Sequence, residues 1–159
     1  LIVSLKITGL WVDEKSLLWA WLAIWVSGLW VAIGQWLLAA KSLELMGQNP
    51  KMISFFLTVS ILGLALIESV VIYWLIIALK IIGSYQTLEV FASIWAWAAM
   101  WLAGLWAWVW EGLLIKGALE AININPENKW KSLAFMVLFV ALIEVVAIYW
   151  LIVAFKILA

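Results

Sequence analysis

Residues 65–76 read ALIESVVIYWLI and residues 141–152 read ALIEVVAIYWLI, so one apolar run with a single glutamate occurs twice in the chain. Each run lies inside a longer apolar stretch, and about 20 mostly apolar residues are enough for a helix to cross a bilayer. The whole chain follows this pattern, because 69% of its 159 residues are hydrophobic and 11% are charged. Its mean hydropathy is +1.20, far outside the range of water-soluble domains. The composition therefore predicts an integral membrane protein.

Four segments are long enough and apolar enough to cross the membrane as helices: roughly 17–46, 52–82, 88–122 and 130–158. Short polar stretches separate them: 47–51, 83–87 and 123–129. Connections of this length place consecutive helices antiparallel, as hairpins. The predicted fold class is an all-α membrane protein made of tandem transmembrane helical hairpins, with four transmembrane helices in total.

The charged residues exclude several kinds of function. Nine lysines balance nine acidic residues, and the chain contains no arginine, histidine or cysteine. Disulfides, thiol chemistry and histidine-ligated metal sites are therefore excluded. A net charge of zero provides no basic surface for nucleic acid, so no nucleic-acid partner is expected.

The chain is an internal repeat. Residues 17–83 align with residues 93–159 without a gap, and many of the aligned positions are identical, among them the two ALIE blocks at 65–68 and 141–144. Self-similarity at a fixed period indicates repeated structural units. We infer one hairpin at 17–83 and a second at 93–159, joined by a linker at 84–92.

The first nine residues, LIVSLKITG, resemble LIIALKIIG at 75–83, where the second helix of the first hairpin ends. We therefore expect residues 1–16 to be the end of a preceding outer helix plus a linker. On this interpretation the chain is part of a protein with at least three hairpins. Chance similarity between apolar helix ends is the alternative.

Each hairpin places one acid in the middle of the membrane. Glu68 lies about 16 residues from the start of its predicted helix, which is about 24 Å along the helix at 1.5 Å per residue. Glu144 repeats the placement. A charge at this depth costs on the order of 3 kcal/mol or more, so the group must be protonated, paired or facing a polar pocket. An interhelical hydrogen bond that only joins helices is the alternative, and the repetition argues against it.

The first helix of each hairpin carries a polar side chain at matching depth. Gln35 lies 15 residues before Pro50, and Glu111 lies 15 residues before Pro126. We expect each of them to face the acid across its own hairpin. Two carboxyl groups that lie this close share a proton or a cation instead of both ionising freely.

Hydroxyl groups accompany the acids. Ser69 follows Glu68 directly, whereas Val145 holds the corresponding position beside Glu144. Tyrosines follow the two acids at a distance of five residues: Tyr73 and Tyr149. Oxygen ligands suit a hard cation such as Na⁺, and the same cluster can hold a proton. The sequence predicts two candidate Na⁺ sites: Gln35, Glu68 and Ser69 in the first hairpin, and Glu111 and Glu144 in the second.

In these residues the chain resembles the c subunit, or proteolipid, of rotary ATP synthases and V-type ATPases, in a duplicated hairpin form. The resemblance rests on ALIESVVIY at 65–73 and on the Asn-Pro pairs at 49–50 and 125–126, and it covers both repeats, 17–83 and 93–159. One set of residues is similar to that family's sodium-binding pattern: Gln35, Glu68, Ser69 and Tyr73. Glu111 with Glu144 is similar to the two-carboxylate variant of that site.

The resemblance implies a role in a membrane rotor. It implies that the glutamates carry H⁺ or Na⁺, that no cofactor is needed, and that no residue of this chain is catalytic, since ATP is made or split elsewhere. The implied partners are other copies in a homo-oligomeric ring, a stator subunit with an essential arginine, central-stalk subunits at the Asn-Pro loops, and lipid. The implied location is a bacterial or archaeal cell membrane.

Tryptophan replaces glycine where the family's inner helix has alternating glycines, most clearly in GLWAWVWEG at 104–112. Alternate positions lie about 200° apart on a helix, so such glycines give two opposite small faces. Helices in lipid approach closely only through small residues, and a unit with like neighbours on both sides closes into a ring. Tryptophan at 106, 108 and 110 is too bulky for that contact.

Three interpretations of the tryptophans are open. In the first, they form an aromatic belt, although such belts lie at the membrane interfaces. In the second, they are a redesign of the inner wall of the ring. In the third, UGA codons that some bacteria read as glycine have been translated as tryptophan. We favour the third, because the inner helices resemble ordinary proteolipids when each of the fifteen tryptophans is replaced by glycine.

Two other function classes are compatible with four apolar helices. One is a small proton-coupled membrane transporter that uses a membrane glutamate, and the other is a designed or structural transmembrane bundle. Neither class requires an acid at equivalent positions of two repeated hairpins, which is what this chain contains.

Overall fold

The computed structural model describes residues 15–84 and 89–159. Residues 1–14 of the predicted preceding helix and residues 85–88 of the predicted linker lie outside this description. The described part contains four long helices: α2 (Lys15–Gln48), α3 (Ile53–Ser84), α4 (Val90–Ile124) and α5 (Lys129–Ile157). These bounds agree closely with the predicted segments. The all-α prediction is confirmed, and no strand occurs in the described residues.

The two hairpin turns have the same local chemistry. Asn49 and Asn125 adopt nearly the same non-helical conformation, with φ/ψ of −132°/78° and −134°/82°. A proline follows each of them, and the residue before a proline is driven out of the helical region. Each proline then begins a single turn of 3-10 helix, Pro50–Met52 or Pro126–Asn128, where its missing N–H is not needed. The Asn-Pro pair therefore ends one helix and starts the return.

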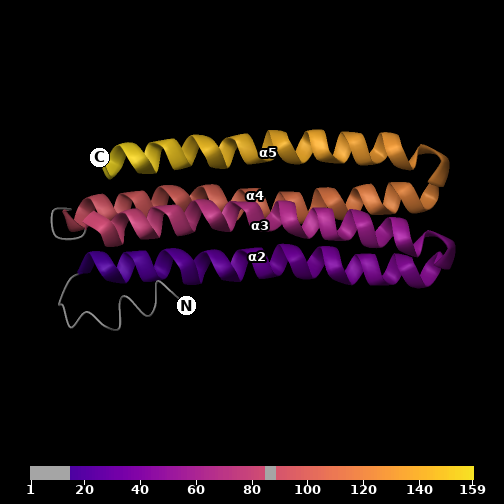
Figure 1. Cartoon of the computed structure of the whole chain (residues 1–159), viewed down its shortest axis with the longest axis horizontal. Coiled ribbons are helices and arrows are strands. Elements are labelled where there is room, and N and C mark those ends of the chain that lie inside the picture. The colour runs from indigo at the N-terminus through magenta and orange to yellow at the C-terminus, as the bar shows by residue number, and fades with distance from the viewer. Residues whose placement is uncertain (1–14, 85–88) are drawn as a thin grey trace.

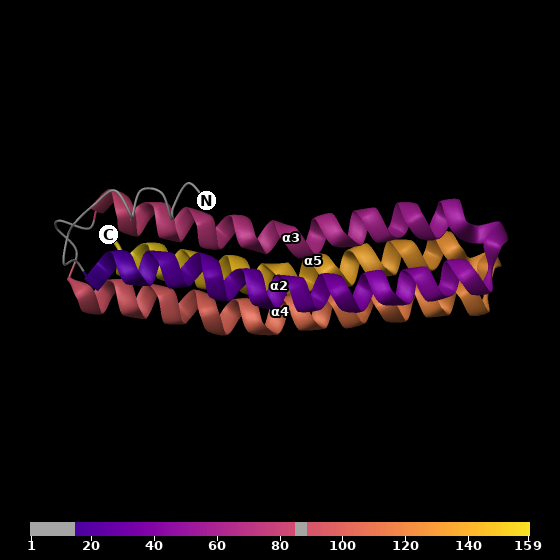
Figure 2. The same cartoon turned by 90° about the horizontal axis from the view of Figure 1, so that it is seen from below.

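The four helices run along one common axis, with both Asn-Pro turns at the same end of the bundle (Figure 1). Figure 2 shows α3 and α4 on opposite sides of the bundle, with α2 and α5 between them. α2 packs along α4, and each of these helices also packs along the second helix of its own hairpin, whereas α3 and α5 touch over a smaller area. We call α2 and α4 the inner helices and α3 and α5 the outer helices.

All four helices are long and apolar enough to cross a membrane. Many large apolar side chains face outward on the outer helices, among them Ile72 on α3 and Leu142 on α5. A protein in water would bury such side chains, but lipid solvates them without cost. The chain is an integral membrane protein.

The inner helices touch backbone to backbone at Gly34 and Gly112. A Cβ atom on Gly34 would lie 2.9 Å from the carbonyl oxygen of Trp108, and one on Gly112 would lie 3.2 Å from the Cα of Gly34. Both obstacles are main-chain atoms, which cannot rotate away. Glycine at these two positions therefore sets the distance between the two hairpins.

Polar contacts join the hairpins near the Asn-Pro turns. The ammonium group of Lys41 lies 3.0 Å from a carboxyl oxygen of Glu44 on its own helix and 3.0 Å from one of Glu120 on α4. Nearer the turn, the amide of Asn123 donates to Gln48 over 3.4 Å. These contacts fix the register of the two inner helices at this end of the bundle.

The tryptophans pack poorly for residues of a native core. Four buried indole N–H groups have no hydrogen-bond partner among the described residues: those of Trp30, Trp74, Trp97 and Trp108. Each unpaired buried donor costs about 1–3 kcal/mol. The rings of Trp74 and Trp108 lie 6.1 Å apart and crowd Gly104, where a Cβ would meet them at 2.7–3.0 Å. These costs favour glycine at such positions, and that interpretation stays a prediction.

The contact between the inner helices predicts the effect of a single methyl group. Gly34→Ala should lower the free energy of unfolding by about 1–3 kcal/mol, as expected for overpacking against atoms that cannot move. Gly83→Ala is the matched control, because nothing lies within 4 Å of a Cβ placed there. Thermal or denaturant unfolding of the purified protein in detergent measures both. Equal stability of the two variants would contradict the close contact.

The tryptophan interpretation predicts the masses of peptides from the protein isolated from its native membrane. We expect peptides that match the printed sequence to be lighter by a whole number of tryptophan-to-glycine replacements, and fragment spectra to place glycine at 106, 108 and 110. Unchanged peptide masses, or UGG codons at those three positions, would show that the tryptophans are genuine.

Candidate functional site

Side chains from three helices meet where the two hairpins join. The hydroxyl of Ser69 on α3 donates a hydrogen bond to a carboxyl oxygen of Glu144 on α5. Glu111 on α4 interacts electrostatically with Glu144, and Tyr73 interacts with both acids. We call Ser69, Tyr73, Glu111 and Glu144 the intrachain acid cluster. The cluster lies inside helices that are able to span a membrane.

Ser69 has two possible acceptors. Its oxygen lies 2.8 Å from the carbonyl oxygen of Leu66 and also contacts Glu144. A hydroxyl has one proton to donate and two lone pairs with which to accept. It can therefore donate to Glu144 when that carboxyl is ionised. When Glu144 is protonated, Ser69 can accept from it and donate to Leu66 instead. Either protonation state of Glu144 leaves this contact satisfied.

Glu111 is the most deeply placed acid of the cluster. None of its surface is exposed (0%), and neither carboxyl oxygen has a hydrogen-bond partner among the described residues. An ionised carboxylate in such surroundings costs many kcal/mol unless a cation or a donor compensates it. The arrangement therefore favours a Glu111 that is protonated or shares a bound cation with Glu144.

Tyr73 extends the cluster along α3. It follows Ser69 by four residues, so both side chains lie on one face of the helix. The ring is half-buried. A tyrosine hydroxyl can both donate and accept a hydrogen bond.

Glu68 lies outside the cluster. Successive residues on a helix point about 100° apart, so Ser69 faces α5 while Glu68 is exposed on another side of α3. Within one chain the hydroxyl of Ser69 thus donates to Glu144, although the sequence analysis placed Ser69 in one site with Glu68. Gln35 is half-buried on α2 and Tyr149 is 63% exposed on α5. The Na⁺ set of Gln35, Glu68 and Ser69 remains a prediction.

The ligand chemistry of the cluster is oxygen-only. Among the described residues no group of three or more His, Cys, Asp or Glu side chains is arranged to hold a metal ion. Two carboxyl groups with a serine and a tyrosine hydroxyl do not match a transition-metal site, but they are suitable ligands for a proton or a hard monovalent cation.

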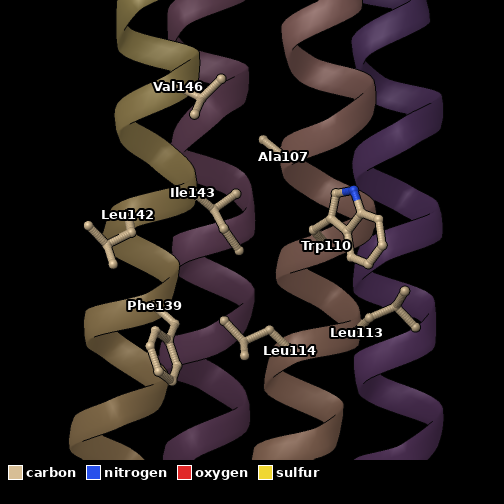
Figure 3. A pocket seen from close by; sticks show the side chains of 8 residues that line it. All are labelled: Ala107, Trp110, Leu113, Leu114, Phe139, Leu142, Ile143 and Val146. Atoms are coloured by element: carbon tan, nitrogen blue, oxygen red, sulfur yellow. The ribbon is translucent and has the colours of Figure 1, made fainter.

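A large groove between α4 and α5 has a different character. It has a volume of about 670 Å³. Its walls are hydrophobic side chains from both helices, with Leu114 of α4 and Ile143 of α5 pointing into the space between them (Figure 3). No acid lines this groove, so it offers nothing to bind an ion.

Sequence reasoning named all four residues of the cluster but assigned their contacts within each hairpin. The hydrogen bond from Ser69 to Glu144 crosses between hairpins. The signal that could have shown this is the position of the serine, because adjacent residues on a helix point about 100° apart.

The comparison with known families agrees with the internal repeat. The family model for the C subunit of ATP synthase matches the chain twice, over residues 18–81 and 94–157. The two matches begin and end at equivalent positions of the repeat, because Leu18 aligns with Ile94 and Ile81 aligns with Ile157. No curated protein sequence matches the chain significantly.

Burial of Glu111 predicts a gain in stability when its carboxyl is removed. Glu111→Leu should raise the free energy of unfolding by about 1–3 kcal/mol, because two unpaired buried oxygens disappear. Glu111→Gln is the control, since it keeps a polar group of the same shape and should give no such gain. Unfolding in detergent measures both, and a leucine variant that is less stable than the parent protein would show that the carboxyl is compensated.

Proposed function

The chain belongs to the family of the ATP synthase C subunit, and from that premise we propose that it is an ion-carrying proteolipid of a rotary ATP synthase or V-type ATPase, with H⁺ or Na⁺ carried on Glu68 and Glu144. The observation that carries the proposal is the buried Glu111 carboxyl without a hydrogen-bond partner, among the described residues, beside Glu144. A group that costs this much inside a membrane protein indicates a bound ion or proton.

The charges of the two carboxyl groups limit which ions the intrachain acid cluster can hold. Two ionised carboxylates in a low-dielectric site repel each other strongly. The cluster is neutral with two protons, or with one proton and one Na⁺. In the sodium case Glu111 retains the proton while Glu144, Ser69 and Tyr73 offer oxygens to the cation. In both cases one ion can leave while the other stays.

The free-energy cost of a bare charge in lipid determines when an ion binds to each glutamate and when it leaves. Each glutamate must be neutralised before it faces the hydrocarbon. Ser69 stabilises the Glu144 carboxylate when the ion departs, because its hydroxyl can turn from the carbonyl of Leu66 and donate to that carboxylate. An arginine of a stator subunit is the counter-charge that the discharged glutamate needs, since this chain has no arginine.

The proposed assembly is a ring of such chains that turns against the stator. The two Asn-Pro turns lie at one end of the bundle (Figure 1), where central-stalk subunits can bind both. Each chain retains an acid in both hairpins, so more ions cross per turn than in a rotor that has lost every second acid. A high ion count favours ATP synthesis over pumping.

The two acids can be tested separately. Glu68→Gln and Glu144→Gln remove the carboxyl while keeping its shape, so each should abolish ATP-driven ion pumping by the parent complex in vesicles. Glu89→Gln is the control, because Glu89 is exposed at the start of α4, at the end of the helix away from the Asn-Pro turns, and should have no effect. Undiminished pumping by both membrane variants would contradict the proposal.

Carbodiimide labelling identifies the ion, because the reagent attacks protonated carboxyl groups. If Na⁺ is carried, it should slow the labelling of Glu144, and Ser69→Ala should weaken this protection about tenfold, since one ligand is worth about 1.4 kcal/mol. Ser60→Ala is the control, because that hydroxyl bonds to Ser42 and Phe56. If Na⁺ has no effect on the rate of labelling, H⁺ is the carried ion.

A further inference from the structure

Two similar hairpins joined by a short linker can dock on one another in two ways. In the structure one face of the α2–α3 hairpin packs on one face of the α4–α5 hairpin. Because the hairpins are repeats, exchanging their places would bring the equivalent positions into contact. We call these two arrangements the observed order and the exchanged order. A bundle of repeated units adopts one topology only if some feature breaks its symmetry.

The ion pair between the hairpins belongs to the observed order. Lys41 of α2 lies 3.0 Å from Glu120 of α4, and only 17% of the lysine side chain is exposed. The repeat equivalent of Lys41 is Gly117. The equivalent of Glu120 is another acid, Glu44. The exchanged order therefore retains a carboxyl group at this contact but has no lysine to neutralise it.

A second lysine acts across the same contact from the other side. Lys116 of α4 interacts electrostatically with Glu44 of α2. Its repeat equivalent is Ala40, so this attraction is also absent from the exchanged order. Each hairpin thus supplies one lysine to an acid of the other hairpin, and the repeat duplicates the acids but not the lysines.

The hydrogen bond beside the Asn-Pro turns has the same asymmetry. The amide of Asn123 donates to Gln48. Their repeat equivalents, Gly47 and Ile124, have no polar side-chain atoms. The exchanged order would therefore lose this contact as well.

We propose that Lys41 and Lys116 determine the order in which the two hairpins of this chain dock. In the exchanged order Glu44 and Glu120 still face each other, whereas both lysines lie outside the contact. Like charges across an interface are strongly unfavourable, and a repulsive element of this kind is an effective way to exclude a competing arrangement. The inference goes beyond the proposed function and does not depend on which ion the glutamates carry.

The docking order has a consequence for the intrachain acid cluster. Ser69 contacts Glu144 across the two hairpins. The exchanged order would place Val145 at the equivalent position, where it has no hydroxyl to offer. The lysines near the turns are therefore positioning residues for the cluster, because they keep Ser69 and Glu144 together within one chain.

Residues 36 and 110 affect the same choice. Gly34 and Gly112 touch backbone to backbone in the observed order, and their repeat equivalents are Trp110 and Trp36. Two indoles are too bulky for such a contact, whereas glycine at both positions removes the obstacle. The test is therefore made on the chain with Trp36→Gly and Trp110→Gly, so that the indoles do not mask the effect of the charges.

Disulfide formation distinguishes the two orders, because the chain has no cysteine. A Cβ on Gly63 lies 3.0 Å from a methyl group of Ile115 in the other hairpin, which is close enough for a disulfide. Gly63→Cys with Ile115→Cys gives the observed-order link. The equivalent pair, Phe139→Cys with Ala39→Cys, gives the exchanged-order link. After oxidation in detergent, a link within one chain leaves a monomer without free thiols, whereas a link between chains gives dimers on a non-reducing gel.

Transferring the lysines to the equivalent positions should reverse the preference. The parent chain should form the observed-order link within single chains. The variant with Lys41→Gly, Gly117→Lys, Lys116→Ala and Ala40→Lys should form it severalfold less, and should form the exchanged-order link within single chains instead. If both links are the same in the variant as in the parent chain, the proposal is wrong.

A double-mutant cycle tests the proposal even if that variant does not fold. Lys41→Gln and Glu120→Gln should each lower the yield of the observed-order link severalfold, and the double variant should lose no more than either single variant. Lys51→Gln with Glu127→Gln is the matched control, because both residues are exposed in the turns and should have no effect. Independent effects of Lys41 and Glu120, or no effect of either, overturn the proposal.

Discussion

The free-energy cost of placing a carboxylate inside a bilayer is the constraint on which the rest of this structure depends. Glu111 and Glu144 lie in helices that are able to span the membrane, and Glu111 is buried without a hydrogen-bond partner among the described residues. A chain that kept such groups only for packing would be more stable with leucine in their place. This cost supports our proposal that the acids bind and release a cation or proton. Ser69 fits the same account, because its hydroxyl can satisfy Glu144 in either protonation state.

The site and the packing of the hairpins depend on one another. Gly34 and Gly112 bring the inner helices into backbone contact, and this contact determines how far α5 lies from α3. The hydrogen bond between Ser69 and Glu144 spans that distance. Widening the contact between the hairpins would therefore also separate Ser69 from Glu144.

Sequence reasoning predicted the four helices, the hairpins and the repeat, because apolar segments of this length and an internal period are strong signals. It did not predict which hairpin supplies the hydroxyl to Glu144. That contact depends on the rotation of α3 about its axis, which one sequence does not define when apolar residues surround the helix on all sides. Sequence reasoning also placed Glu111 at the depth of the acid but could not show that its carboxyl is fully buried.

Infrared difference spectroscopy of the assembled protein in lipid tests the central claim most directly, because protonated carboxyl groups and carboxylates absorb at different frequencies. We predict a protonated carboxyl band at neutral pH that disappears in Glu111→Gln, and a second band that changes when the ion bound at Glu144 is exchanged and disappears in Glu144→Gln. Bands that show both side chains as free carboxylates within the membrane would contradict the account.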